Sequence, residues 1–143
     1  MSLADNKALV RRFTDEVMTA GNTAAIAELC IAGSAFAGGI SGQVRAMKTA
    51  FPDLRMTIDE IVAEGDRVAI RVTTHATNTG PLVGLPAFGR LEKPVPPTGQ
   101  SVTGSGMYMF TISDGKILSF AYELDQIGLL QQLGWAFTAP SHT

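Results

Sequence analysis

Two carboxylates near the end of the chain have the residue type and spacing for acid–base chemistry. Glu123 and Asp125 are two positions apart in a segment, residues 117–125, whose alternating pattern predicts a β-strand. Side chains two positions apart share a face of a strand, so we expect both carboxylates on the face that carries Ser119 and Ala121. If this face lines an apolar cavity, desolvation and mutual repulsion raise at least one carboxyl pKa and provide a general base. If it faces water, the pair has no such role. The opposite face would carry Phe120, Tyr122 and Leu124.

Each carboxylate also has a structural interpretation. Asp125 stands where the strand gives way to a predicted helix, so its carboxylate can act as a helix N-cap. Capping lowers a carboxyl pKa whereas apolar burial raises it, so the two interpretations of Asp125 are physically opposed. Glu123 could form a structural ion pair with Arg71 or Arg45.

Three further residues are candidates for a site. Tyr108 lies in a predicted strand, where its hydroxyl could donate a hydrogen bond to an enolate oxygen or simply be satisfied in the core. His75 shares the parity of the polar residues of its strand, so it is expected to face solvent or a partner subunit. Cys30 lies on the apolar face of a short helix and is most simply a core residue.

Composition and missing motifs exclude several classes of protein. The 143 residues are 45% apolar and 17% charged, which predicts a single folded domain over 1–143. Residues 1–4 are expected to be flexible or vector-derived, and residues 135–143 to form a tail. A net charge of −2 without a basic cluster argues against nucleic acid as a partner. One cysteine and two histidines predict no metal site, and no apolar stretch is long enough to cross a membrane. The single cysteine excludes an internal disulfide framework, so we expect a cytoplasmic protein. Glycine-rich phosphate motifs and a serine-nucleophile elbow are absent.

The first part of the chain predicts helices. Apolar residues recur at helical spacing from Asp5 to Ala20, and a second short helix carries Ile26 and Leu29 on its inner face. Residues 32–42 contain four glycines and are expected to be irregular. A third helix is expected from Ser41 to Phe51.

Beyond Pro52 the pattern changes to the alternation of strands. Hairpins are predicted around the turns at residues 64–66 and 113–116, and a closing helix follows near residues 127–133. Residues 78–100 hold five of the seven prolines and are expected to form a long loop. Helices followed by strands predict an α+β fold with the helices on one face of an antiparallel sheet.

Seven fragments follow one another along the chain: residues 6–13, Ala50-Phe51-Pro52-Asp53-Leu54, Glu64-Gly65-Asp66-Arg67-Val68, Thr79-Gly80, Pro97-Thr98-Gly99, Asp114-Gly115-Lys116-Ile117 and the closing Asp-x-x-Gly-Leu-Leu-x-Gln-Leu-Gly segment that begins at Asp125. In this order they resemble the SnoaL-like polyketide cyclases of the nuclear transport factor 2-like superfamily. The resemblance runs from about Asn6 to Gly134, and the closing segment is its most specific part.

The resemblance implies a cone-shaped α+β barrel, in which a curved mixed or antiparallel sheet wraps around the N-terminal helices. It also implies a deep apolar pocket and a homodimer built on the sheet, for which an outward-facing Phe120 and Tyr122 would be suited. In such cyclases an aspartate at the end of the last strand removes a proton next to a carbonyl, and the ring closes by aldol addition without a cofactor. Asp125 occupies that position. The side chains expected to contact substrate are Asn78, Ala121, His75, Phe13 and Met107.

The chain departs from the family pattern around the expected pocket. Gly38-Gly39, Asn78 and Ala121 stand where the family often has His, His and Trp, and Tyr108 replaces an acid or His. About ten extra residues, 87–96, include Phe88, Arg90, Glu92 and Lys93 and are expected at the pocket rim. These changes leave the base in place and alter its companions.

The leading hypothesis is therefore a cofactor-free enzyme of aldol-cyclase or isomerase type that acts on a lipophilic carbonyl compound. Asp125 would be the base, and Tyr108 or Asn78 would donate to the oxyanion. The alternative is a non-catalytic binding protein that holds a lipophilic molecule in the same pocket. A third interpretation, an epoxide hydrolase, needs an Asp-Arg-Asp network, for which the sequence shows no matching spacing.

Overall fold

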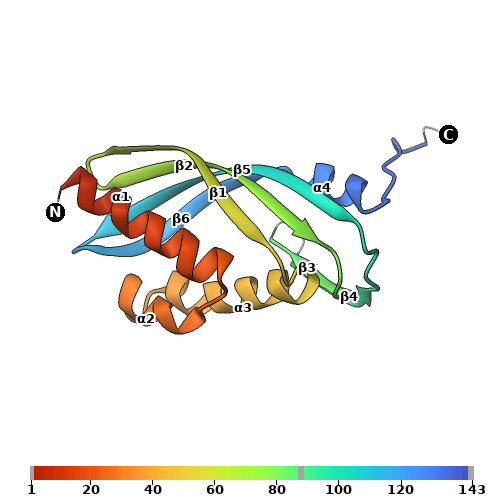
Figure 1. The fold of residues 1–143 in the computed structure, drawn as a ribbon, viewed down its shortest axis with the longest axis horizontal. Coiled ribbons are helices and arrows are strands. Elements are labelled where there is room, and N and C mark those ends of the chain that lie inside the picture. Colours follow the sequence, from red (N-terminus) through yellow and green to blue (C-terminus); the bar gives the residue numbers. More distant parts are fainter. Residues whose placement is uncertain (1, 87–88, 142–143) are drawn as a thin grey trace.

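The computed structural model describes residues 2–86 and 89–141, which form an antiparallel sheet with the N-terminal helices packed on one face (Figure 1). The predicted α+β class is confirmed. In chain order the elements are α1 (Leu3–Arg12), the π-helix η1 (Phe13–Thr19), the 3-10 helix η2 (Thr23–Ala25), α2 (Ile26–Leu29), α3 (Ala35–Ala50), β1 (Arg55–Glu64), β2 (Arg67–Thr77), β3 (Leu82–Leu85), β4 (Gly89–Val95), β5 (Ser101–Ser113), β6 (Lys116–Leu124) and α4 (Gln126–Gln132).

The sheet is curved and open. Its strand order is β1-β2-β5-β6 with every neighbouring pair antiparallel, so β1 and β6 are edges and the barrel implied by the resemblance does not close. The β5–β6 turn has positive φ at both Asp114 and Gly115, as a tight two-residue hairpin requires. A bulge between Ile58 and Glu60 keeps four apolar side chains of β1 on the helix-covered face: Met56, Ile58, Ile61 and Ala63.

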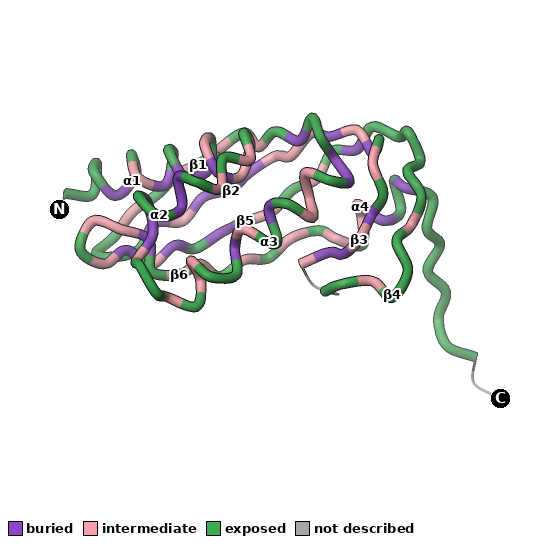
Figure 2. The backbone as a smooth tube through the Cα atoms, turned by 90° about the horizontal axis from the view of Figure 1, so that it is seen from below, coloured by how far each residue is buried: buried purple, intermediate pink, exposed green. Residues whose placement is uncertain are grey.

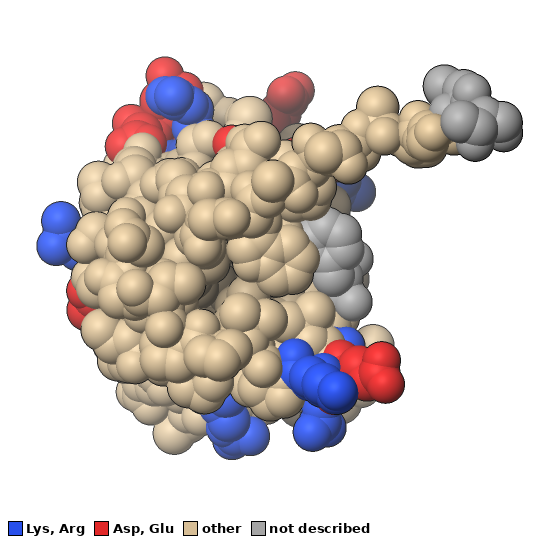
Figure 3. Space-filling model, turned by 90° about the vertical axis from the view of Figure 1, so that its right-hand side faces the viewer, with Lys and Arg blue, Asp and Glu red and all other residues tan. Residues whose placement is uncertain are grey.

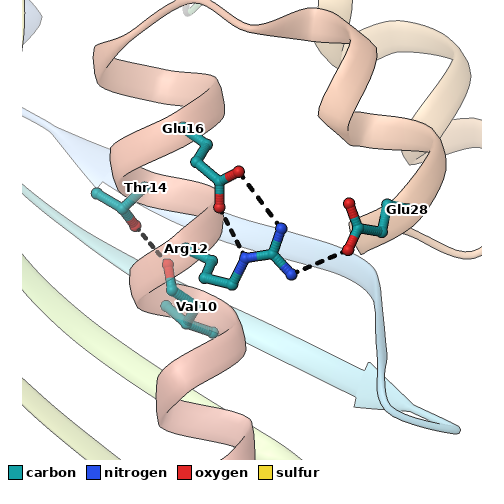
Figure 4. A network of polar contacts seen from close by, with 5 residues as sticks. All are labelled: Val10, Arg12, Thr14, Glu16 and Glu28. Carbon is teal, nitrogen blue, oxygen red and sulfur yellow. Dashed lines mark hydrogen bonds and ion pairs between the residues drawn. The ribbon is translucent and has the colours of Figure 1, made fainter.

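The first helix is longer and less regular than its sequence predicts. It begins at Leu3, where Ser2 and Asp5 form a reciprocal capping box, and it changes to π geometry at Phe13. At this point the Thr14 hydroxyl donates to the Val10 carbonyl oxygen, a back-bond of the kind that distorts helices (Figure 4).

Ion pairs of Arg12 join the first helix to α2. The Arg12 guanidinium lies 2.7 Å from a Glu16 oxygen and 3.1 Å from a Glu28 oxygen (Figure 4). All three side chains are exposed, so the contact adds little stability and serves mainly to orient α2.

The expectation that residues 32–42 are irregular is wrong. Helix α3 already begins at Ala35, with Ser34 as N-cap accepting a hydrogen bond from the Ala37 amide. The glycines of this stretch are exposed, while Ile40 and Val44 are buried against the sheet. Burial of the apolar face therefore outweighs the poor helix propensity of glycine.

The expected loop at residues 78–100 is also corrected, because it contains the β3–β4 hairpin. Leu82 and Leu85 on β3 are buried, which fastens the hairpin to the body of the protein. Gly84 permits the close approach of the two strands, since a Cβ there would lie 2.6 Å from the Gly89 carbonyl oxygen. Four of the five prolines flank the two short strands, and Pro94 lies inside β4, where the edge of a two-stranded sheet tolerates it.

Two hydrophobic clusters make up the interior. Figure 2 shows where buried residues lie along the backbone of the helices and strands. The larger cluster lies between the N-terminal helices and the sheet and is built around Phe13, Ile70 and Phe110. The smaller cluster joins the end of α3, the β3–β4 hairpin and α4. Within the described residues, no helix has the length and apolar character needed to cross a membrane.

Candidate active site

A cavity of about 100 Å³ separates the two hydrophobic clusters. Its walls come from the helices η1, α3 and α4, the four strands of the main sheet, and Leu85 and Pro86. Figure 3 views the molecule from the end that carries α4 and the β3–β4 hairpin; uncharged side chains dominate this face, which is hollowed near its middle. Ligand pockets usually measure about 300–1,000 Å³, so a ligand must displace part of the wall. Met18, Met47 and Met56 line the cavity, and their flexible side chains can make room.

Aromatic side chains form one wall of the cavity. Tyr108 on β5 is the cross-strand partner of Tyr122 on β6, with ring centroids 5.9 Å apart. Phe120 also lines the cavity, and its ring centroid lies 5.1 Å from that of Tyr108. Phe13 is fully buried and packs edge-on to Phe120, so it supports this wall from behind and does not line the cavity.

The Tyr108 hydroxyl is a hydrogen-bond donor without a partner among the described residues. Only 5% of Tyr108 is exposed, and none of the described residues hydrogen-bonds to its hydroxyl. Burial, and secondarily the neighbouring Tyr122, raise the pKa of the Tyr108 phenol above its ordinary value. The group therefore stays neutral at physiological pH and can donate to a bound oxygen.

Asp125 caps α4 and also lines the cavity. Its Oδ1 accepts a hydrogen bond from the Gly128 amide at 2.8 Å, as the capping interpretation predicts. Its own amide donates to the Ser105 carbonyl oxygen, which fixes the start of α4 against β5. The residue is solvent-exposed on one side and borders the cavity on the other. Within the described part of the chain, Oδ2 has no hydrogen-bond donor and remains able to accept a proton.

The expected faces of β6 are reversed. Phe120, Tyr122 and Leu124 face the cavity, whereas Ala121 and Glu123 are exposed on the outer face. The strand ends at Leu124, so Asp125 does not follow the alternation of β6. It stands at the start of α4 and lines the cavity.

The placement of Ala121, Glu123 and Met107 outside the cavity corrects the expectation that they line it. Met107 is 54% exposed and lies in register with Glu123 and Arg71 on the outer face. Among the described residues, neither Arg71 nor Arg45 lies within ion-pair distance of Glu123.

Asn78 and His75 also lie away from the cavity. Asn78 is buried, and its amide donates to the carbonyl oxygens of Ala50 and Gly80 while its Oδ1 accepts from the amide and hydroxyl of Thr98. These bonds use its hydrogen-bonding capacity within the fold, so Asn78 cannot be the oxyanion donor considered from the sequence. His75 lies on the outer face, where its Nδ1 is 3.3 Å from the Thr103 hydroxyl.

Sequence reasoning missed several polar lining residues. Thr74 shares the parity of Val72 in β2, which could have placed it on the cavity wall. Tyr122 was missed because the faces of β6 were reversed. Gln43 lies within the helix expected from Ser41 to Phe51, but nothing in the sequence assigned it to the cavity. Phe88, in the expected insertion, lies outside the described residues.

A family model described as SnoaL-like polyketide cyclase matches residues 8–133. The chain belongs to this family. Among solved structures, TsrD from Streptomyces laurentii has a TM-score of 0.78 and 22% identity, over 94% of this chain and 98% of its own. AclR from Streptomyces galilaeus, for which a hydroxylase activity has been suggested, has a TM-score of 0.77 and 25% identity, over 97% of this chain and 87% of its own. A SnoaL-like polyketide cyclase from Agrobacterium tumefaciens C58 has a TM-score of 0.70 and 16% identity, over 94% of this chain and all of its own.

The family model and the solved structures confirm the resemblance stated from the sequence at the level of family and fold. No curated protein matches the chain. Among residues 2–86 and 89–141, no three His, Cys, Asp or Glu side chains gather closely enough to hold a metal ion. The titratable residues among those described around this SnoaL-like cavity are Asp125, Tyr108 and Tyr122.

Proposed function

We propose that this SnoaL-like protein is a cofactor-free enzyme that removes a proton next to the carbonyl of a neutral, lipophilic substrate, as an aldol cyclase or an isomerase does. One observation carries the proposal: the Asp125 carboxylate and the open Tyr108 hydroxyl line the same, otherwise largely apolar, cavity. A carboxylate can take the proton, and a neutral phenol can stabilise the oxyanion that results.

In the proposed reaction, Asp125 Oδ2 removes a proton from the carbon next to the carbonyl, and the electron pair of that C–H bond forms an enolate. The Tyr108 hydroxyl donates a hydrogen bond to the enolate oxygen. In a cyclase the enolate carbon attacks a second carbonyl of the same molecule, and the new alkoxide takes the proton from Asp125. In an isomerase the proton returns to a different carbon. Neither route changes the oxidation state, so neither requires a redox partner.

Proton exchange tests this chemistry without knowledge of the natural substrate. The enzyme should accelerate incorporation of deuterium next to the carbonyl of β-tetralone, a small lipophilic ketone, when followed by NMR in heavy water. We expect Asp125→Asn to reduce the accelerated rate by about 10²–10⁴-fold and Tyr108→Phe by about 10²-fold. Glu60→Gln, an exposed carboxylate on β1, is the matched control. An acceleration that Asp125→Asn leaves intact would exclude Asp125 as the base.

The second candidate is a non-catalytic binding protein that uses the same cavity. It is favoured by the exposure of Asp125 and by its hydrogen bond from the Gly128 amide, because both give the carboxylate a structural role as the N-cap of α4. This candidate predicts that ketones bind equally well to the wild type and to Asp125→Asn, with no protein-dependent deuterium exchange in either.

A further inference from the structure

Gly104 is a glycine in the middle of β5 that neither backbone geometry nor packing requires. Glycine weakens a strand, so its presence there needs a reason. Its φ is not left-handed, and a Cβ built on it would meet no atom within 4 Å among the described residues. An alanine would therefore fit the protein itself.

Other glycines of the chain show what packing constraints look like. A Cβ on Gly106, two residues further along β5, would overlap Leu124 Cδ2. A Cβ on Gly80 would overlap the Thr49 carbonyl oxygen. Gly104 differs from both, because the space beside it is empty.

That empty space belongs to the cavity. Gly104 lines the cavity together with Thr74, its cross-strand partner on β2. On its other side β6 has ended, and the Asp125 amide donates to the carbonyl oxygen of the next residue, Ser105. The bare backbone of Gly104 thus forms a piece of cavity wall close to Asp125.

We propose that the wall at Gly104 receives a flat, neutral ring of the substrate, held next to Asp125. Without a side chain, the peptide planes of β5 let the face of a ring approach to van der Waals distance, where a Cβ would hold it off. Among the described lining residues Asp125 is the one that carries a charge, and no Lys or Arg is present to pair with an anionic ligand. The inference rests on the proposed function for the location of the substrate, and it adds Gly104 as a position that determines which substrates fit.

Binding of prodan, a neutral and flat naphthyl ketone whose fluorescence shifts to the blue in apolar surroundings, tests the proposal. The wild type should bind prodan saturably. Gly104→Ala should weaken binding by a few fold and Gly104→Leu by at least about tenfold, because the added side chain occupies the place of the ring. Gly104→Ala should melt no lower than the wild type, since its Cβ enters empty space. Ser101→Leu, which adds a side chain on the outer face of the same strand, should leave binding unchanged.

The outcomes separate this inference from the proposed chemistry. No saturable binding by the wild type, or equal binding by Gly104→Leu and the wild type, would overturn the ring site. Loss of binding in Gly104→Leu supports the site even if Asp125→Asn has no effect on deuterium exchange, in which case only the proposed catalysis fails. A lower melting temperature for Gly104→Ala would show that packing does require this glycine and would also overturn the inference.

Discussion

Asp125 caps α4 and also lines the cavity, and the lack of a side chain at Gly128 leaves room for its carboxylate. A Cβ on Gly128 would overlap Asp125 Oδ2 and lie 2.8 Å from Oδ1. The carboxylate therefore occupies the space that any other residue at position 128 would need. Glycine lowers the propensity of a short helix, and here that cost is explained by the position of the carboxylate.

Gly128→Ala should accordingly separate stability from activity. Alanine improves helix propensity by about 1 kcal/mol, and displacement of the cap costs about the same, so the free energy of unfolding should change little. Deuterium exchange into β-tetralone should fall at least about tenfold, because the carboxylate moves out of position. Prodan binding should persist, since Gly128 does not line the cavity. Gln131→Ala, an exposed change in the same helix, is the control, and equal exchange rates for Gly128→Ala and the wild type would contradict the positioning role.

At the scale of elements, the smaller hydrophobic cluster depends on polar bonds that join three segments. Asn78 follows β2 and bonds to the end of α3 through Ala50, to Gly80, and to the segment before β5 through Thr98. Because the side chain is 1% exposed, water cannot replace these bonds. The end of the cavity formed by α3 and the hairpin is held together here.

Asn78→Asp should destabilise this end of the molecule. The change keeps the shape of the side chain but directs a carboxylate oxygen at the carbonyl oxygens of Ala50 and Gly80, which lose their donor. We expect a loss of about 2–4 kcal/mol in the free energy of unfolding, measured by urea denaturation. Thr79→Ala, at the exposed neighbouring position, should change stability by less than about 0.5 kcal/mol. A loss for Asn78→Asp no larger than that control would show that Asn78 does not connect these segments.

The elements also show why the sequence predicts some features and misses others. Alternation and turn residues locate β2, β5 and β6, because a half-buried strand leaves a two-residue period in the sequence. The β3–β4 hairpin is too short and too rich in proline to leave such a period. Alternation also reveals which residues share a face without revealing which face is inside, and this is why Glu123 was expected in the cavity. The bulk of Phe120 and Tyr122 was the better guide.

At the scale of the whole molecule, the helices cover one face of the sheet and leave the other uncovered. Val62, Ala69, Met109 and Ala121 align in register across the four strands of the uncovered face. Val62 is 63% exposed and Met109 is 44% exposed, which is costly for side chains in contact with water. The next row carries Glu60, Arg71 and Glu123. An apolar row flanked by charges of both signs is suited to an isologous contact, in which each charge can meet its opposite on a second copy.

The homodimer implied by the resemblance is therefore proposed to form through this outer face. Wild-type protein should elute with light scattering at twice the monomer mass, and Met109→Asp should elute as a monomer, because two carboxylates would be buried near the two-fold axis. Phe137→Asp is the matched control, since Phe137 is 48% exposed in the C-terminal tail and lies outside the sheet. A dimer that survives Met109→Asp, or a monomeric wild type, would refute this interface. Prodan binding by the Met109→Asp monomer should be retained, because Met109 lies on the outer face of the sheet and does not line the cavity.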